Sequence, residues 1–155
     1  MKLRVIALGQ KMPAWVVAGW DEYARRMPRA FALELVEVKS EARDRGKPLP
    51  QLLALEAVRI KTACKDAYVV ALDERGEPWT TRQLADALAR WRDAARDVAI
   101  VIGSADGLAE AVKRNADVVL ALSALTLPHG IVRIVVAEQL YRAVSLLGGH
   151  PYHRE

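Results

Sequence analysis

Apolar runs of strand length alternate along the chain with longer segments whose apolar positions recur at helical spacing. The strand-like segments are residues 2–8, 33–39, 68–73, 98–103 and 118–123, and the helix-like ones are residues 15–27, 51–65, 80–94 and 131–147. Residues 104–116 indicate a turn followed by a helix. The last three strand-like segments are apolar throughout, which fits the centre of a parallel sheet that is covered on both faces. The pattern therefore predicts an α/β fold built as a single-domain parallel sheet.

Polar and turn-forming residues separate these elements. Residues 40–50 carry a glycine and two prolines and predict a loop, residues 74–79 (ERGEPW) predict a turn, and residues 148–155 form a polar tail. Thr80 or Thr81 precedes an amphipathic segment and is suited to cap that helix. The sequence contains neither an internal repeat nor a linker, so residues 1–155 are predicted to form one domain.

Composition favours a folded protein of a reducing compartment. Hydrophobic residues make up 52% of the 155 residues and charged residues 27%, which suits a real core and argues against disorder. Cys64 is the one cysteine, so a disulfide within the chain is impossible. The apolar runs are shorter than a membrane span, and the first residues lack the long apolar region of a secretory signal. We therefore expect a cytoplasmic protein with no membrane association.

The net charge is +4, with a sequence pI of about 9.4, and arginine supplies most of the positive charge. Arginine suits bidentate contacts with phosphate, so an anionic partner such as nucleic acid is one interpretation. The other is a basic protein that binds no particular anion, because a charge of +4 is modest. If the partner is RNA, Arg25, Arg26 and Arg29 and the segment Arg43–Lys47 are candidates to meet its backbone.

The segments that follow the three apolar strands predict a ligand site. Ligands of open parallel sheets bind beyond the carboxyl ends of the strands, and here those ends run into LDERGEPW, IGSADG and LSALTLPH. Gly103 and Gly107 allow a close backbone approach, which would suit a flat heterocycle with a ribose. The phosphate-loop, dinucleotide and nucleophile-elbow motifs are absent. The two histidines of HPYH lack an accompanying cluster of cysteines or carboxylates, so we expect no metal.

The last helix-like segment is apolar on most of its sides. A helix of that kind must be buried on most sides, and one sheet covers only one of them. A second copy of the chain in a two-fold homodimer would cover another, whereas the alternative is a central helix within one monomer. Glu138 and Arg142 stand four residues apart, in the favourable order for an ion pair within the helix.

Motifs spread over the whole chain resemble one family. They are the opening MKL…ALGQKMPAWV, the segments ALDERGEPW, VIGSADGL, NADVVLALS and LSALTLPH, the helix motif VR…AEQLYRA, and the ending HPYHRE. The chain is thereby identified as a member of the SPOUT-class methyltransferases that N3-methylate a pseudouridine in 23S ribosomal RNA (the RlmH family). Family members usually read Gly-Gly after the fourth strand, whereas this chain reads Gly103-Ser104, which concerns the turn geometry more than the reaction.

The resemblance implies a SPOUT fold with a C-terminal trefoil knot, a homodimer, and S-adenosylmethionine as the methyl donor. It also implies that the enzyme acts on 23S ribosomal RNA, on the assembled ribosome. The family's cofactor positions carry over to a set of residues at the three strand ends. These are Leu72, Gly103, Leu122, Ser123, Ala124, Leu125, Thr126 and Leu127.

The polar tail supplies the catalytic candidates. His153 is the first choice for handling the proton that the imide nitrogen must lose, Tyr152 for stacking or hydrogen bonding, and Arg154 for holding a phosphate or carbonyl oxygen. Gly148 and Gly149 would let the tail fold over the pocket of either subunit. Substrate-binding candidates on the last helix are His129, Arg133 and Arg142, although His129 has a second interpretation as a cap of that helix.

Two other functions compete with this one. The chain could be a non-catalytic module that binds ribosomes or RNA with the same fold, an alternative that Ser104 favours. It could also be a methyltransferase of another RNA, such as tRNA. Binding of S-adenosylmethionine discriminates the first alternative from an enzyme, and mapping of the methylated nucleotide discriminates the second.

Overall fold

A computed structural model describes residues 1–9 and 11–154 and shows strands alternating with helices in chain order. The strands are β1 (Lys2–Leu8), β2 (Ala32–Val38), β3 (Tyr68–Pro78), β4 (Val98–Ile102) and β5 (Val118–Ala121). The helices are α1 (Ala14–Ala24), α2 (Leu49–Cys64), α3 (Thr81–Asp93), α4 (Glu110–Asn115) and α5 (His129–Leu147). Short 3-10 turns cover Arg29–Phe31 and Pro151–Arg154. The described helices are too short or too polar to cross a membrane.

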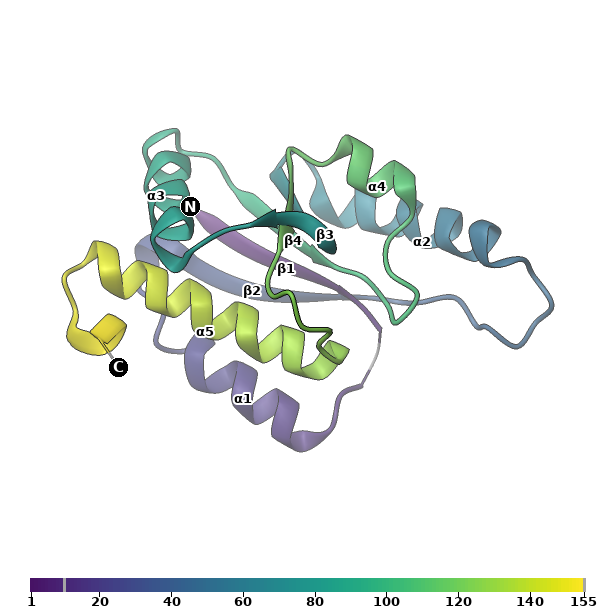
Figure 1. Cartoon of the computed structure of the whole chain (residues 1–155), viewed down its shortest axis with the longest axis horizontal. Helices are drawn as coiled ribbons and strands as arrows, with labels where there is room; N and C mark the ends of the chain where they lie inside the picture. The colour runs from purple at the N-terminus through teal and green to yellow at the C-terminus, as the bar shows by residue number, and fades with distance from the viewer. Residues whose placement is uncertain (10, 155) are drawn as a thin grey trace.

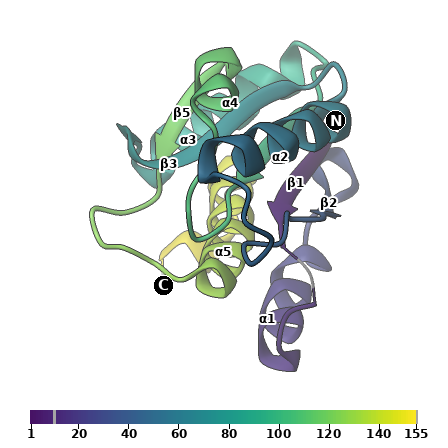
Figure 2. The ribbon, with the colours of Figure 1, turned by 90° about the vertical axis from the view of Figure 1, so that its right-hand side faces the viewer.

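The strands form one parallel sheet in the order β2-β1-β4-β3-β5 (Figure 1). Helices α1, α3 and α5 cover one face of the sheet, and α2 and α4 cover the other (Figure 2). Alternate residues of each central strand therefore enter two separate hydrophobic cores; Val5 belongs to the first core and Ile6 to the second. The prediction of a single α/β domain with a doubly covered parallel sheet is confirmed.

The third strand is longer than the sequence pattern indicates, and the turn expected over residues 74–79 is wrong. Leu72 and Glu77 both align with Leu120 of β5, so the residues between them bulge out and the strand then resumes. Gly76 makes this possible: a Cβ atom there would lie 2.7 Å from the carbonyl oxygen of Val119. The sequence pattern does not reveal the second half of the strand, because its residues are mostly charged and pair with β5 only through their backbone.

Helix boundaries agree with the pattern to within a few residues. Thr80 caps α3: its hydroxyl accepts from the backbone N–H of Gln83, and the Gln83 side chain accepts from the N–H of Thr80. Thr80 is thus the capping residue of the two that the sequence offers.

Helix α5 packs on the sheet between α1 and α3, and two glycines bring α1 close to it. A Cβ atom at Gly19 would lie 2.7 Å from Cδ1 of Ile134, and one at Gly130 would lie 2.9 Å from Cγ2 of Val16. One copy of the chain thus covers much of α5. Ile131 and Val135 of α5 stay only half-buried, and Trp15 of α1 is 57% exposed.

Candidate cofactor and substrate site

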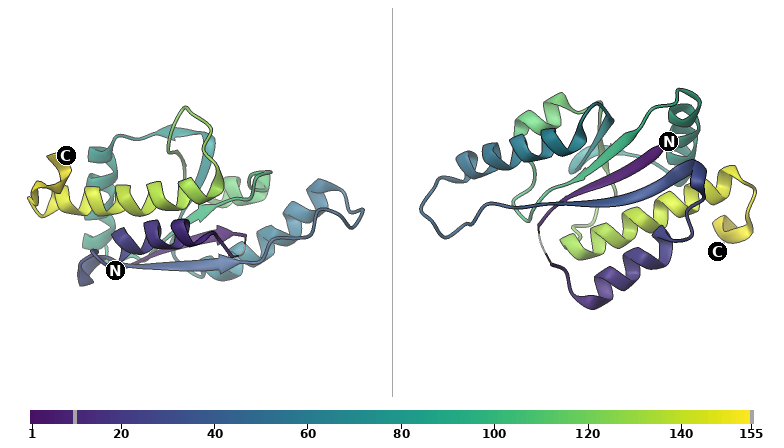
Figure 3. Two further views of the ribbon diagram at one scale, coloured as in Figure 1. Left: turned by 90° about the horizontal axis from the view of Figure 1, so that it is seen from below. Right: turned by 180° about the vertical axis from the view of Figure 1, so that it is seen from behind.

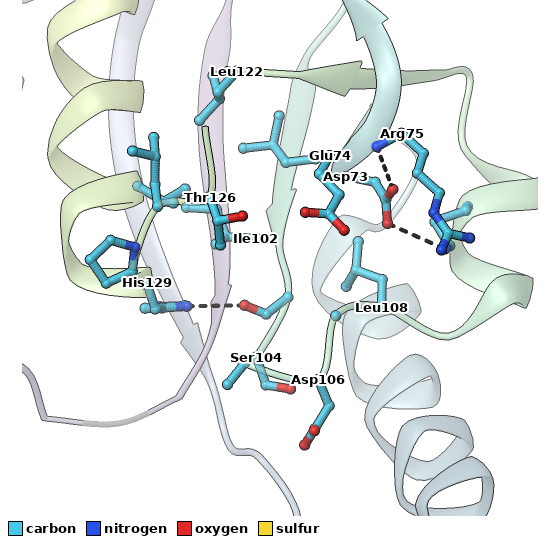
Figure 4. Close-up of a pocket in the computed structure, with 18 of the residues that line it drawn as sticks. Asp73, Glu74, Arg75, Ile102, Ser104, Asp106, Leu108, Leu122, Thr126 and His129 are labelled. Carbon is cyan, nitrogen blue, oxygen red and sulfur yellow. Dashed lines mark hydrogen bonds and ion pairs between the residues drawn. The ribbon is translucent and has the colours of Figure 1, made fainter. Parts of the chain in front are cut away.

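A cavity of about 850 Å³ lies at the carboxyl ends of β3, β4 and β5 (Figure 4). Its walls come from the three segments that the sequence marks: residues 72–75 after the first part of β3, residues 102–108 after β4, and residues 122–129 between β5 and α5. Leu53 of α2 and Val132 of α5 close its sides. The convergence of these segments follows from the parallel sheet, which places all three strand ends on one edge.

Most of the predicted cofactor positions line this cavity. The lining set comprises Leu72, Gly103, Leu122, Ser123, Leu125, Thr126 and Leu127. Ala124 lies in the same loop but is not among the lining residues. The structure brings these positions together around one space, and their contact with a cofactor stays a prediction.

The segment after β4 is a tight turn that requires glycine at its first position. The backbone N–H of Gly107 donates to the carbonyl of Ser104 over 2.9 Å, and Gly107 has a φ of +80°. A Cβ atom at Gly103 would lie 2.8 Å from the backbone carbon of Gly107. Glycine at position 103 therefore leaves room for the turn, and the exposed backbone of 103–107 faces the cavity.

His129 connects this turn to α5. Its Nδ1 lies 3.0 Å from the carbonyl oxygen of Gly103 (Figure 4), and Nε of Arg133 donates to its Nε2 over 2.9 Å. Burial lowers the pKa of His129; the hydrogen bond to Gly103 opposes this, but the charge of Arg133 adds to it, and the net pKa lies below the ordinary value of 6.5. His129 is therefore neutral, and both of its ring nitrogens are engaged.

Arg133 lies behind His129 and does not line the cavity. Its side chain is only 2% exposed, and it forms an ion pair with Glu37 at the end of β2 over 3.0 Å. Its Nη2 is buried without a hydrogen-bond partner among the described residues, close to Gly9. The two predicted substrate-binding residues thus have different positions. His129 lines the cavity, whereas Arg133 lies outside it and donates a hydrogen bond to His129.

An acidic side of the cavity was missed by the sequence analysis. Asp73 accepts from the backbone N–H of Arg75 and from the ammonium of Lys113 (Figure 4), and Lys113 also pairs with Glu110. Partial burial raises the pKa of Asp73, but these donors outweigh it and the net pKa lies below the usual value. The lining carries the carboxylates of Asp73, Glu74, Asp106 and Glu110 against the cations of Arg75 and Lys113.

Ser104 has a partner that no local pattern indicates. Arg43, in the loop between β2 and α2, donates to the Ser104 hydroxyl over 3.0 Å and to Asp106 over 2.9 Å. The same guanidinium pairs over 2.9 Å with Glu56, which is 1% exposed. Ser104 does not have a positive φ, so serine fits the turn. The departure from Gly-Gly thus adds a contact and leaves the turn intact.

The catalytic candidates of the tail lie at the far end of α5 from this cavity (Figure 1). The Tyr152 hydroxyl donates to Glu138 over 3.2 Å, and its ring lies 4.7 Å from that of Tyr141. Arg142 pairs with Glu138, which confirms the expected ion pair, and its guanidinium lies 4.9 Å from the Tyr152 ring. Burial first, and then Tyr23 and Glu138, raise the pKa of Tyr152.

His153 and Arg154 belong to the same docked tail, in which Nδ1 of His153 contacts the carbonyl of His150. The structure therefore does not bring His153, Tyr152, Arg154 or Arg142 together with the cofactor positions of the same chain. Among the described residues, no group of three or more His, Cys, Asp or Glu side chains could hold a metal ion.

Comparisons with known proteins point in one direction. A family model described as "Predicted SPOUT methyltransferase" matches residues 1–153. Proteins of Burkholderia mallei and Burkholderia pseudomallei named "Ribosomal RNA large subunit methyltransferase H" are 56% identical over 155 residues, which is 99% of this chain and of each relative.

Solved structures share the fold. One is a probable methyltransferase from Bordetella pertussis, with a TM-score of 0.61 at 21% identity over 92% of this chain and 93% of that one. Another is a tRNA methyltransferase from Aquifex aeolicus, with a TM-score of 0.56 at 17% identity over 92% of this chain and 70% of that one.

Proposed function

Because this chain belongs to the SPOUT methyltransferase family, we propose that it transfers the methyl group of S-adenosylmethionine to N3 of a pseudouridine in 23S ribosomal RNA. Support for the RNA comes from the relatives named for the large ribosomal subunit, which match over the full length. The pseudouridine as target is what the resemblance of the sequence motifs to that family implies. The observation that carries the proposal is the cavity at the three strand ends, lined by the positions that the family uses for its donor.

The cavity fits this donor in size, charge and backbone. Its volume of about 850 Å³ lies within the usual range for small-molecule sites. Gly103 leaves room for a backbone that a Cβ atom would obstruct. Four carboxylates against two cations suit a ligand that carries a sulfonium and an ammonium group. When bound, S-adenosylmethionine supplies a methyl group that is already activated for transfer to nitrogen.

His129 aligns the site and does not abstract the proton. His129 is neutral, but Arg133 occupies its Nε2 and Gly103 its Nδ1, so it has no free lone pair for the imide proton. We assign His129 the role of fixing the Gly103 turn, and Arg133 the role of holding His129. The base or charge-stabilising donor is therefore a group other than His129.

The geometry favours a homodimer in which the tail of one copy completes the pocket of the other. Helix α5 has 19 residues and separates the tail from the cavity by roughly 28 Å at 1.5 Å per residue. A docked tail cannot reach its own cavity, so His153 and Arg154 would act on the partner's substrate. The exposed Trp15 and half-buried Val135 supply apolar surface for such a contact. Ribosomal RNA as substrate places the protein in the cytoplasm, and the trefoil knot belongs to the same proposal.

The test measures binding and transfer separately. Calorimetry with S-adenosylmethionine should show one site for each chain, and tritiated donor should label 23S RNA in ribosomes that lack the modification. Nuclease digestion and mass mapping should then place the methyl on N3 of a pseudouridine. Absence of donor binding at millimolar concentration would support the non-catalytic module instead. Label on tRNA in place of 23S RNA would refute the substrate.

A further inference from the structure

A second hollow, of about 500 Å³, lies beside the loop between β2 and α2, which extends from one end of the molecule (Figure 3). Four cations and one carboxylate line it. The lining set is Lys39, Ser40, Glu41, Ala42, Arg45, Lys47 and Arg59. The hollow is thus polar and strongly positive, in contrast to the cofactor cavity, whose charged lining is mainly acidic.

One of the four cations of the hollow is held by contacts within the chain, and the other three are unpaired among the described residues. Arg59 pairs with Glu41 and donates to the carbonyl of Lys39 over 2.8 Å, which ties the loop to α2. The side chains of Lys39, Arg45 and Lys47 are in exposed residues and have no hydrogen bond or ion pair with the rest of the described chain. Three unpaired cations held around a preformed hollow favour the binding of an anion.

Arg43 separates this hollow from the cofactor cavity. Its guanidinium donates to Glu56, Asp106 and Ser104 and to the carbonyl of Glu41, so four of its five N–H groups are engaged within the chain. Arg43 is among the predicted phosphate contacts, but its engagement with these four groups argues against that role. Arg43 follows Ala42 of the hollow in the chain and contacts Ser104 and Asp106, which line the cofactor cavity, so the two sites are neighbours.

We propose that Lys39, Arg45 and Lys47 bind the phosphodiester backbone of the RNA whose base enters the neighbouring cofactor cavity. The inference rests on the proposed function for the identity of the RNA. An RNA strand that presents one base to the acidic cavity places its adjacent phosphates within reach of a cationic hollow at the same rim. The lining offers charge and hydrogen-bond donors and no apolar pocket, which fits phosphate contacts that position a strand without reading its sequence.

The test compares two triple variants of equal charge. The site variant is Lys39→Gln with Arg45→Gln and Lys47→Gln. The control is Lys61→Gln with Arg82→Gln and Arg90→Gln, three exposed residues that form no ion pair with the rest of the described chain. Each is assayed with large ribosomal subunits that lack the methyl group, and by fluorescence anisotropy with a labelled fragment of 23S RNA. Urea unfolding and calorimetry with S-adenosylmethionine verify that folding and donor binding persist.

The site variant should raise KM for the subunits about 10-fold or more, with kcat and donor affinity unchanged, because ionic contacts dominate RNA affinity. The slope of log affinity against log salt should fall by about 2 units, at about 0.7 for each lost phosphate contact. An unchanged KM, or an equal rise in the control variant, would overturn the proposal. So would displacement of the RNA fragment by polyglutamate of equal charge at equal concentration.

The two failures can be told apart. If the wild-type protein transfers no methyl group, the proposed function fails, while the anisotropy measurement still compares the two variants on RNA binding. If methyl transfer proceeds and both variants bind the RNA fragment like the wild type, the proposed phosphate contacts of the hollow are refuted and the proposed function is unaffected.

Discussion

The Nε atom of Arg133 donates a hydrogen bond to Nε2 of His129, one turn earlier on α5, over 2.9 Å. Because Nε2 must accept, the proton of the neutral ring resides on Nδ1, which then donates to the Gly103 carbonyl over 3.0 Å. Glu37 neutralises the buried guanidinium from the end of β2. One tautomer of one histidine thus links α5 and β2 to the turn that borders the cofactor cavity.

The first prediction concerns pH. The pKa of folded His129 lies below its ordinary value of 6.5, so the unfolded chain binds a proton more readily than the folded one as pH falls below that value. Protonation also replaces the acceptor at Nε2 by a second donor that faces Arg133. We expect stability and donor affinity to be fully present above pH 6.5 and to decline as pH falls toward the lowered pKa.

Urea unfolding and calorimetry between pH 5 and pH 8 measure this decline. His129→Gln, which can still donate and accept, should lose about 1 kcal/mol at pH 8 and show a shallower decline below pH 6.5. His153→Ala is the matched control and should retain the wild-type slope, since His153 lies in the tail. Parallel curves for wild type and His129→Gln would contradict the assignment.

The second prediction concerns Gly76, where β3 resumes after its bulge. A Cβ atom there would lie 2.7 to 2.8 Å from three backbone atoms of Val119 and Leu120, which cannot move without breaking the β3–β5 pairing. Gly76→Ala should therefore cost about 1–3 kcal/mol in the free energy of unfolding.

Gly148→Ala is the control for this variant, because its Cβ atom would meet nothing closer than 3.6 Å at an ordinary φ of −84°. It should leave the urea midpoint unchanged or raise it slightly. Equal midpoints for the two variants would show that the β3 extension does not constrain Gly76.

The third prediction concerns Arg43. Arg43→Ala leaves Glu56, which is 1% exposed, without its cation, and because Arg43 is itself 32% exposed we expect a loss of about 2 kcal/mol. Ser104→Gly removes one hydrogen bond and should cost about 0.5–1.5 kcal/mol. A double-mutant cycle measured by urea unfolding should show coupling, since both changes remove the same contact. Arg92→Ala breaks an exposed pair with Asp93 and should change little.

Additive costs for Arg43→Ala and Ser104→Gly would show that the hydroxyl contributes nothing through Arg43. The contact also has a functional readout. Arg43→Ala should weaken the binding of both S-adenosylmethionine and RNA, because Arg43 stands between their two predicted sites, whereas Ser104→Gly should weaken them less.

The sequence predicts those parts of the molecule that depend on local pattern. Two of the three apolar strands, β3 and β4, lie in the centre of the sheet as expected, whereas β5 lies at its edge and β1 takes the third central place. A parallel sheet still places the ends of β3, β4 and β5 together, so the cavity around Gly103 and Leu122 follows from periodicity. The cap of α3 by Thr80 is also local, because it involves Thr80 and Gln83, which are three residues apart. Each of these features joins positions whose relation is set by one element or by the sheet.

Contacts between loops that are distant in the sequence leave no local pattern from which they could be predicted. Arg43 lies 61 residues from Ser104 and 63 from Asp106, and nothing in the loop 40–50 distinguishes it from Arg45. Likewise the pairing of Lys113 with Asp73 spans 40 residues, from the last turn of α4 to the bulge of β3. The sequence pattern does not reveal the extension of β3, because the extension pairs only with the backbone of β5 and such pairing needs no apolar alternation.

The fourth prediction concerns the tail. Deletion of residues 152–155 should reduce kcat for ribosomal subunits by about 100-fold, since general acid–base assistance contributes on that order. The dissociation constant of S-adenosylmethionine should remain unchanged, because the predicted donor contacts come from the three strand-end segments and not from the tail. Equal losses in turnover and donor affinity would contradict a role on the substrate side.

Mixed dimers then decide which copy uses the tail. A chain with Gly103→Val cannot form the turn at the cavity but keeps its tail, and the truncated chain keeps its cavity. If the tail serves the partner, each mixed dimer has one complete site, and unfolding and refolding the two inactive chains together should restore about a quarter of wild-type activity. If the tail serves its own chain, the mixture stays inactive. Gly103→Val refolded with itself is the control, and restored activity there would mean that position 103 does not limit the site.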